Sequence, residues 1–96
     1  MTPFVLHATP RYERQAAGLP PTVKKQLAAR HLQLAAGPRH PSLQTRSVEG
    51  TVGDFGGKVF EAYVSEKYRL TWESGPGKGE ITLRNVDNHD DCLADP

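Results

Sequence analysis

The sequence has little of what several common structural and catalytic devices require. Its 96 residues include a single cysteine, Cys92, which excludes an internal disulfide framework and a zinc site built on paired cysteines. No apolar run approaches the roughly 20 residues of a membrane helix, and no signal-peptide pattern is present. Aromatic residues make up 7% of the chain. We therefore expect a soluble, cytoplasmic protein with one small domain over residues 1–96 and a lean core.

The charge is nearly balanced overall, at +1, but it is divided unevenly along the chain. Residues 1–46 hold seven Lys or Arg and one acid, a net charge of +6, whereas residues 47–96 hold five bases and ten acids, a net charge of −5. Such a dipolar protein can offer a basic face to nucleic acid or to an acidic partner. The alternative is a pair of solvated faces of opposite sign.

Local signals predict an α+β fold in which a strand and a two-helix hairpin precede a three-stranded antiparallel meander (β-α-α-β-β-β). Thr9 and Pro10 form a helix start, and the Pro20-Pro21 pair ends one helix and begins the next. The meander strands show the alternation of apolar residues typical of a half-buried sheet. The expected ranges are 3–8 for the first strand, 10–17 and 21–36 for the helices, and 58–65, 68–73 and 80–86 for the meander. Residues 38–57 have the composition of a loop, and the acidic tail 87–96 is expected to be partly frayed.

The register of the first meander hairpin follows from the requirement that apolar side chains share a face. A three-residue loop at 66–68 sets Val64 opposite Leu70 and also sets Glu61 opposite Glu73, with a nearby arginine needed between the two acids. The helices then cover the apolar face. The opposite face is expected to be open.

Three segments carry a family resemblance. They are PRHPSL at 38–43, VFEAYVSEKYRL at 59–70 and RNVDNHD at 84–90. Their order and spacing resemble those of the RelE/ParE superfamily, the toxins of bacterial type II toxin-antitoxin systems. The likeness covers nearly the whole chain and implies the RelE-like fold.

The resemblance also implies an activity and partners. RelE-like, YoeB-like and YafQ-like toxins enter the ribosomal A site and cut mRNA without a metal, and a cognate antitoxin holds them inactive. We therefore expect a ribosome-dependent mRNA endonuclease that needs no cofactor. The alternatives are a ParE-like toxin that binds DNA gyrase and a catalytically degenerate RelE-like interaction module.

Three residues are the candidates for catalysis. Arg69 matches the strand arginine that contacts the reacting phosphate in RelE-like and YoeB-like enzymes, and His89 matches the tail histidine of YafQ-like enzymes. His89 titrates near neutrality and suits a general acid, with Asp87 or Asp90 to hold its tautomer. Glu61 is the carboxylate available as a general base. The alternatives are a cross-strand partner of Glu61 or Glu73 for Arg69, and a solvated or capping residue for His89.

A second group of residues is assigned to RNA binding, through cationic side chains for phosphates and aromatic rings for bases. Tyr63 and Lys67 stand where YafQ-like enzymes carry a histidine and an aspartate. The paired lysines of the RelE-like strand are absent, with Lys58 nearby. Asp87, His89, Asp90, Asp91 and Cys92 lack the paired spacings of a zinc motif, so we assign no metal. The assigned RNA-binding residues are His40, Arg46, Lys58, Tyr63, Lys67, Tyr68 and Arg84.

Overall fold

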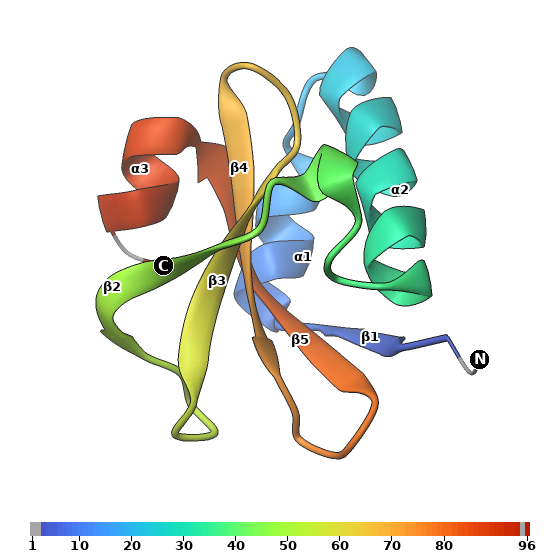
Figure 1. Cartoon of the computed structure of the whole chain (residues 1–96). Coiled ribbons are helices and arrows are strands. Elements are labelled where there is room, and N and C mark those ends of the chain that lie inside the picture. Colours follow the sequence, from blue (N-terminus) through green and yellow to red (C-terminus); the bar gives the residue numbers. More distant parts are fainter. Residues whose placement is uncertain (1–2, 95) are drawn as a thin grey trace.

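The structure is a computed structural model that describes residues 3–94 and residue 96. Its five strands form one sheet in the order β1-β5-β4-β3-β2, in which β1 runs parallel to β5 and the other neighbours are antiparallel (Figure 1). The elements along the chain are β1 (Val5–Ala8), α1 (Pro10–Ala17), α2 (Pro21–Ala36), the 3₁₀ turn η1 (Pro41–Leu43), β2 (Arg46–Val52), β3 (Lys58–Tyr63), β4 (Tyr68–Ser74), β5 (Glu80–Asn88) and α3 (His89–Ala94). This α+β architecture confirms the predicted fold class.

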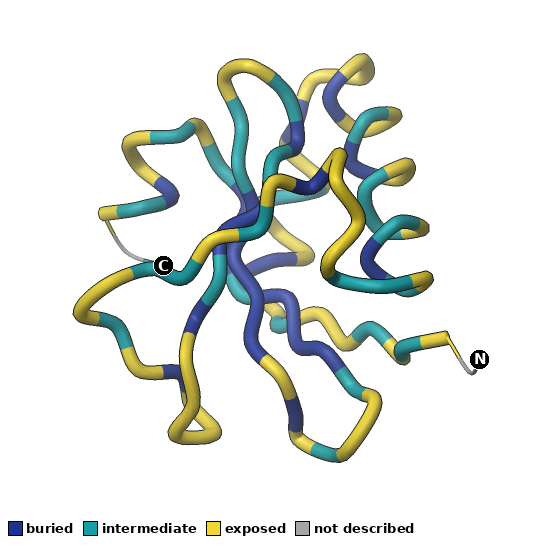
Figure 2. The backbone as a smooth tube through the Cα atoms, in the orientation of Figure 1, coloured by how far each residue is buried: buried dark blue, intermediate teal, exposed yellow. Residues whose placement is uncertain are grey.

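The core lies between the helical hairpin and one face of the sheet. Tyr12, Leu27 and Leu34 contribute from α1 and α2, and each is at least 95% buried. Leu70 and Ile81 meet them from β4 and β5, which are the most continuously buried strands (Figure 2). The apolar stripes predicted from residue spacing are therefore the faces that pack together.

The start of the hairpin follows the predicted capping pattern. The Thr9 hydroxyl accepts a hydrogen bond from the Tyr12 backbone N–H at 3.1 Å, and Pro10 occupies the first helical position. The Tyr12 hydroxyl and His31 Nε2 lie 2.6 Å apart and join α1 to α2. Burial lowers the pKa of His31 below its ordinary value.

No helix within the described ranges is long and apolar enough to cross a membrane.

The prediction of a loop over 38–57 is wrong in part, because β2 forms there and adds an edge strand beside β3. Arg46 pairs with Glu61, Ser47 with Phe60 and Val52 with Lys58, and the register shifts between the first two pairs and the last. An irregular edge strand is half solvated and needs no run of apolar residues. Its composition therefore carries no strand signal.

The face of the sheet away from the hairpin is covered, although the sequence predicted an open one. The tail that was expected to fray forms α3 against β4 and β5, and the Asn85 amide donates to the Cys92 carbonyl at 3.2 Å. Thr71 Oγ1 donates to the Pro96 carbonyl at 2.9 Å. Glu73 is 1% exposed and accepts hydrogen bonds from the backbone N–H groups of Asp54 and Phe55. Only the rim of this face is therefore accessible.

The register of the β3–β4 hairpin also differs from the prediction. Ala62, and not Val64, pairs with Leu70, and Tyr63 pairs with Arg69. The turn closes earlier than predicted: the N–H groups of Val64 and Ser65 both donate to the Tyr68 carbonyl, and the Tyr68 N–H donates to the Ser65 carbonyl, each at 3.2 Å. Every pair is shifted by two positions from the predicted register, and this even shift leaves each side chain on its predicted face.

The same shift separates the two acids that the sequence placed opposite each other. Glu61 now faces Thr71, and Glu73 faces Val59 on β3 and Thr82 on β5. Each acid has its own arginine: Arg46 Nη2 lies 2.8 Å from Glu61 Oε1, and Arg84 pairs with Glu73. No shared cation is needed.

Candidate nucleic-acid interface

Two of the three predicted catalytic residues meet at the turn between β3 and β4. The His89 backbone N–H donates to the Lys67 carbonyl at 2.8 Å, which brings the start of α3 against this turn. Arg69 follows the turn on β4, between Tyr63 on β3 and Asp87 on β5. We call Tyr63, Lys67, Arg69 and His89 the turn site.

The backbone of the turn holds Arg69 in place. Its Nη1 donates to the carbonyls of Ser65 at 2.6 Å and Tyr68 at 2.9 Å, and its guanidinium carbon lies 4.9 Å from the Tyr63 ring centroid. Arg69 therefore does not pair with Glu61 or Glu73, which was the alternative role. Within the described chain, the hydrogen bonds of this guanidinium all use Nη1, so Nε and Nη2 stay available to a phosphate.

Arg30 of α2 joins the turn site, and sequence reasoning missed it. Its guanidinium carbon lies 5.1 Å from the same Tyr63 ring, and its Nε donates to the Val64 carbonyl at 3.3 Å. Two guanidinium groups thus engage the ring that was assigned to base stacking. Arg30 is separated from Val64 by 34 residues, so no local pattern indicates the contact.

His89 has the freedom that an acid at a surface site requires. Its side chain is 43% exposed, and its Nδ1 lies 3.4 Å from Asp90 Oδ1. Of the two acids proposed to hold its tautomer, the structure selects Asp90 over Asp87. A proton on Nδ1 directed at this carboxylate would leave Nε2 to face a substrate.

Glu61 lies on the same face as Tyr63, one pleat repeat or about 6.6 Å along the strand. Its side chain is 8% exposed, and its Oε1 accepts hydrogen bonds from both Nε and Nη2 of Arg46. The Glu61 carboxylate is therefore engaged by Arg46, whereas Arg69 keeps Nε and Nη2 available and His89 is partly exposed.

Two of the assigned RNA-binding residues face inward. Arg84 pairs with Glu73 and lies 3.4 Å from Asp54, while its Nε donates to the Pro96 carbonyl at 3.1 Å. Its side chain is 16% exposed. Tyr68 is half-buried and packs against the core. Both residues stabilise the fold through these contacts.

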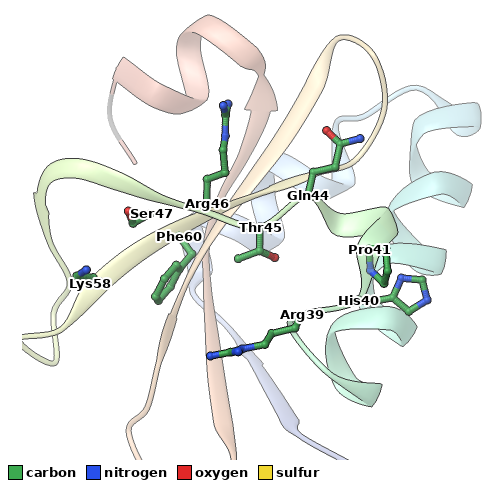
Figure 3. A pocket seen from close by; sticks show the side chains of 9 residues that line it. All are labelled: Arg39, His40, Pro41, Gln44, Thr45, Arg46, Ser47, Lys58 and Phe60. Atoms are coloured by element: carbon green, nitrogen blue, oxygen red, sulfur yellow. The ribbon is translucent and has the colours of Figure 1, made fainter.

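The other assigned cations lie in a separate groove, whose volume is about 390 Å³ (Figure 3). His40, Arg46 and Lys58 line it together with two residues that the sequence did not single out, Arg39 and Phe60. Phe60 packs against the core side of the sheet and stacks on Trp72, with ring centroids 4.7 Å apart and planes 25° apart. The groove is thus on the helix side of β3, and Tyr63 and Arg69 are on the opposite side. We call it the Phe60 groove.

The described residues bring no three His, Cys, Asp or Glu side chains together in a way that could hold a metal ion. Cys92 is fully buried, and burial raises the pKa of its thiol to about 12. The thiol is therefore protonated at neutral pH and is a poor ligand or nucleophile.

The fold is that of solved RelE structures. The archaeal RelE–RelB complex from Pyrococcus horikoshii OT3 matches with a TM-score of 0.71 and 16% identity, over 92% of this chain and 96% of that one. The intact E. coli RelBE toxin–antitoxin complex matches with a TM-score of 0.66 and 19% identity, over 88% and 95%. The toxin–antitoxin complex RelBE2 from Mycobacterium tuberculosis matches with a TM-score of 0.57 and 22% identity, over 93% and 94%.

No protein-family model and no curated protein sequence matches the chain. The structural matches, each over most of both chains, show that the protein has the RelE-like fold. The predicted resemblance is confirmed at the level of the fold.

Proposed function

We propose that this protein is the toxin of a type II toxin-antitoxin system and acts in the cytoplasm as a ribosome-dependent mRNA endonuclease that uses no metal. The observation that carries the proposal is the turn site on a RelE-like fold. There Arg69 is fixed over Tyr63, with donors to spare, beside an exposed His89. The three solved structures reported above are RelE complexes, which supports the class of protein.

The chemistry requires little of the protein, because RNA carries its own nucleophile. The 2′ oxygen attacks the phosphorus, the bond to the 5′ oxygen breaks, and the products are a 2′,3′-cyclic phosphate and a free 5′ hydroxyl. Arg69 would stabilise the charge that develops on the phosphorane oxygens. His89 would protonate the leaving 5′ oxygen, and Glu61, once released by Arg46, would take the proton of the 2′ hydroxyl.

The turn site also has the right substrate-binding character. Lys67 is exposed at the tip of the turn, and Arg30 adds a second guanidinium beside Tyr63. Arg30 thus supplies positive charge from α2 where the paired lysines of the RelE-like strand are missing. A cationic cluster of this kind suits the closely spaced phosphates of a single strand.

The test is cleavage of a defined mRNA on purified ribosomes, with primer extension to locate the cut. The parent chain should cut ribosome-bound mRNA in the presence of EDTA, and Lys25→Ala, a change at an exposed position on α2, should cut equally well. If the parent leaves mRNA intact, gyrase supercoiling assays decide between the gyrase-binding and the degenerate alternatives. In cells, loss of amino-acid incorporation should precede loss of thymidine incorporation.

We further propose a cognate antitoxin as the partner, because two of the solved structures that share this fold are toxin–antitoxin complexes. Lys24 and Lys25 are exposed on α2, which belongs to the +6 half of the chain. An acidic or amphipathic antitoxin segment over the hairpin would use them. Replacing Lys24, Lys25 and Arg30 together by alanine should weaken the complex and flatten its salt dependence. Unchanged affinity across a salt titration would contradict this contact.

A further inference from the structure

The Phe60 groove is not used by the chemistry proposed above, and its composition points to a ligand. We propose that it binds a single-stranded segment of RNA on the helix side of the sheet, apart from the nucleotide that reacts at the turn site. The inference rests on the proposed function in that RNA is the substrate. Binding in the groove is measurable without cleavage.

The charge of the groove selects an anion. None of the nine described residues that line it is acidic, whereas Arg39, Arg46 and Lys58 are cationic. Arg46 uses its guanidinium on Glu61, but no ion pair is found for Arg39 or Lys58 within the part of the chain that the structure describes. The two unpaired cations make the groove a site of positive potential next to a partly exposed ring.

His40 adds a directional donor. Its Nδ1 accepts a hydrogen bond from the Ser42 backbone N–H at 3.1 Å, which caps the η1 turn. A neutral imidazole with Nδ1 as acceptor carries its proton on Nε2. With Nδ1 occupied by this bond, His40 lines the groove with Nε2 as a donor and adds no acceptor that would repel a phosphate.

The aromatic wall distinguishes RNA from other anions. Phe60 is supported by Trp72, so its ring keeps a fixed orientation as it lines the groove. Arg39 and Lys58 project near this ring from separate segments (Figure 3). A platform for a base with cations beside it is the arrangement by which proteins hold single strands. An acidic peptide would match the charge and leave the flat ring without a planar partner.

The volume agrees with this ligand. At about 390 Å³ the groove is near the lower end of pockets that take small organic ligands, which suits one nucleotide and excludes a duplex. The nucleotides on either side of the one in the groove would lie over the protein surface beside it. We expect binding to be tolerant of sequence, because stacking and phosphate contacts are available to every nucleotide.

The test uses the full chain and a fluorescent RNA oligonucleotide with 2′-O-methyl riboses, which cannot be cleaved by attack of the 2′ oxygen. Binding is followed by anisotropy and by the emission of Trp72, the single tryptophan of the chain. The double variant Arg39→Ala/Lys58→Ala should bind about tenfold or more weakly. Its log–log salt slope should fall by about 1.4, the value for two lost contacts to single-strand phosphates. Arg14→Ala/Lys78→Ala, at two exposed positions outside the groove, is the control of equal charge.

Phe60 is tested in two ways, because its removal could disturb the core. Phe60→Tyr keeps the ring and should bind like the parent, whereas Phe60→Leu should weaken binding about fivefold or more. Circular dichroism and urea unfolding show whether each variant is folded. If Phe60→Leu is unfolded, the result for Arg39→Ala/Lys58→Ala alone decides whether the groove binds RNA.

Two results would overturn the inference. One is an equal loss of RNA binding in the groove variant and in the Arg14/Lys78 control, which would mean unspecific attraction of a polyanion. The other is displacement of the RNA by an acidic peptide that binds the parent more tightly than the RNA does. If the groove variant also binds this peptide as much more weakly as it binds RNA, the groove is a peptide site. If the parent binds RNA in the groove but does not cut ribosome-bound mRNA, the proposed function fails and the groove stands. If the parent cuts mRNA and the groove variant binds RNA like the parent, the inference about the groove is wrong and the proposed function stands.

Discussion

Replacing Arg69 separates the chemistry of the turn site from its stability. Arg69→Ala removes the guanidinium proposed to stabilise the phosphorane, and losing a preorganised contact of this kind costs on the order of 10²–10³ in rate. Arg69→Lys keeps the charge but cannot form a bidentate fork with two phosphate oxygens. The lysine variant should therefore cleave at a rate between those of the parent and the alanine variant.

The contacts of Arg69 in the structure set an upper limit on how much stability Arg69→Ala loses. Arg69 donates to the carbonyls of Ser65 and Tyr68 and lies over the Tyr63 ring. Each hydrogen bond contributes about 0.5–1.5 kcal/mol at most at this half-exposed position, and the cation–π contact contributes about 0.5–1 kcal/mol. Together these give about 1.5–4 kcal/mol as the upper limit of the free energy of unfolding that Arg69→Ala loses, and we expect the variant to remain folded.

The assay follows single-turnover cleavage of ribosome-bound mRNA, with urea unfolding of the same preparation. Lys25→Ala is the control for loss of a positive charge elsewhere on the surface. The assignment would be refuted by an alanine variant that is folded and cleaves like the parent. A variant that loses cleavage only in proportion to its unfolded fraction would show that Arg69 is structural.

Three further changes test other parts of the structure. His89→Ala should lower the cleavage rate about 10²-fold, less than the arginine variant, because solvent reaches this position and water replaces part of a general acid. The free energy of unfolding should fall as the pH drops below about 6.5, because burial lowers the pKa of His31 and the unfolded chain therefore binds the proton more readily. In urea titrations at several pH values, His31→Gln should reduce this pH dependence. Gly53→Ala places a Cβ 2.3 Å from the buried Glu73 carboxylate and should cost about 1–3 kcal/mol, whereas Gly57→Ala, with no atom within 4 Å, should unfold like the parent.

Much of the candidate site is predictable because a family motif places it. The YRL segment and the NHD segment identify Arg69 and His89, and the structure brings both to one turn. The same reasoning assigned RNA binding to Arg84, which lies on the strand where the sequence predicted it. Its side chain turns to Glu73 because that buried acid needs a cation. A strand pattern predicts the face of a residue, not the partner that its side chain selects.

The residues that sequence reasoning missed share a physical reason. Arg30 reaches Tyr63 from α2, and Arg39 reaches the Phe60 groove from the segment before η1. On a helix or in a loop, an isolated arginine is indistinguishable from an ordinary solvated charge. Only the packing of the hairpin against the sheet brings these side chains to β3.

What the sequence determined by itself is local. The Thr9–Pro10 cap, the Pro20-Pro21 break and the alternation in the meander specify the helices and strands, because capping, proline geometry and side-chain period act within a few residues. What the tertiary structure decided is the pairing of β2 beside β3 and the docking of α3 over the far face of the sheet. Each of these depends on buried polar groups finding partners distant in the chain, and a local pattern does not contain that information.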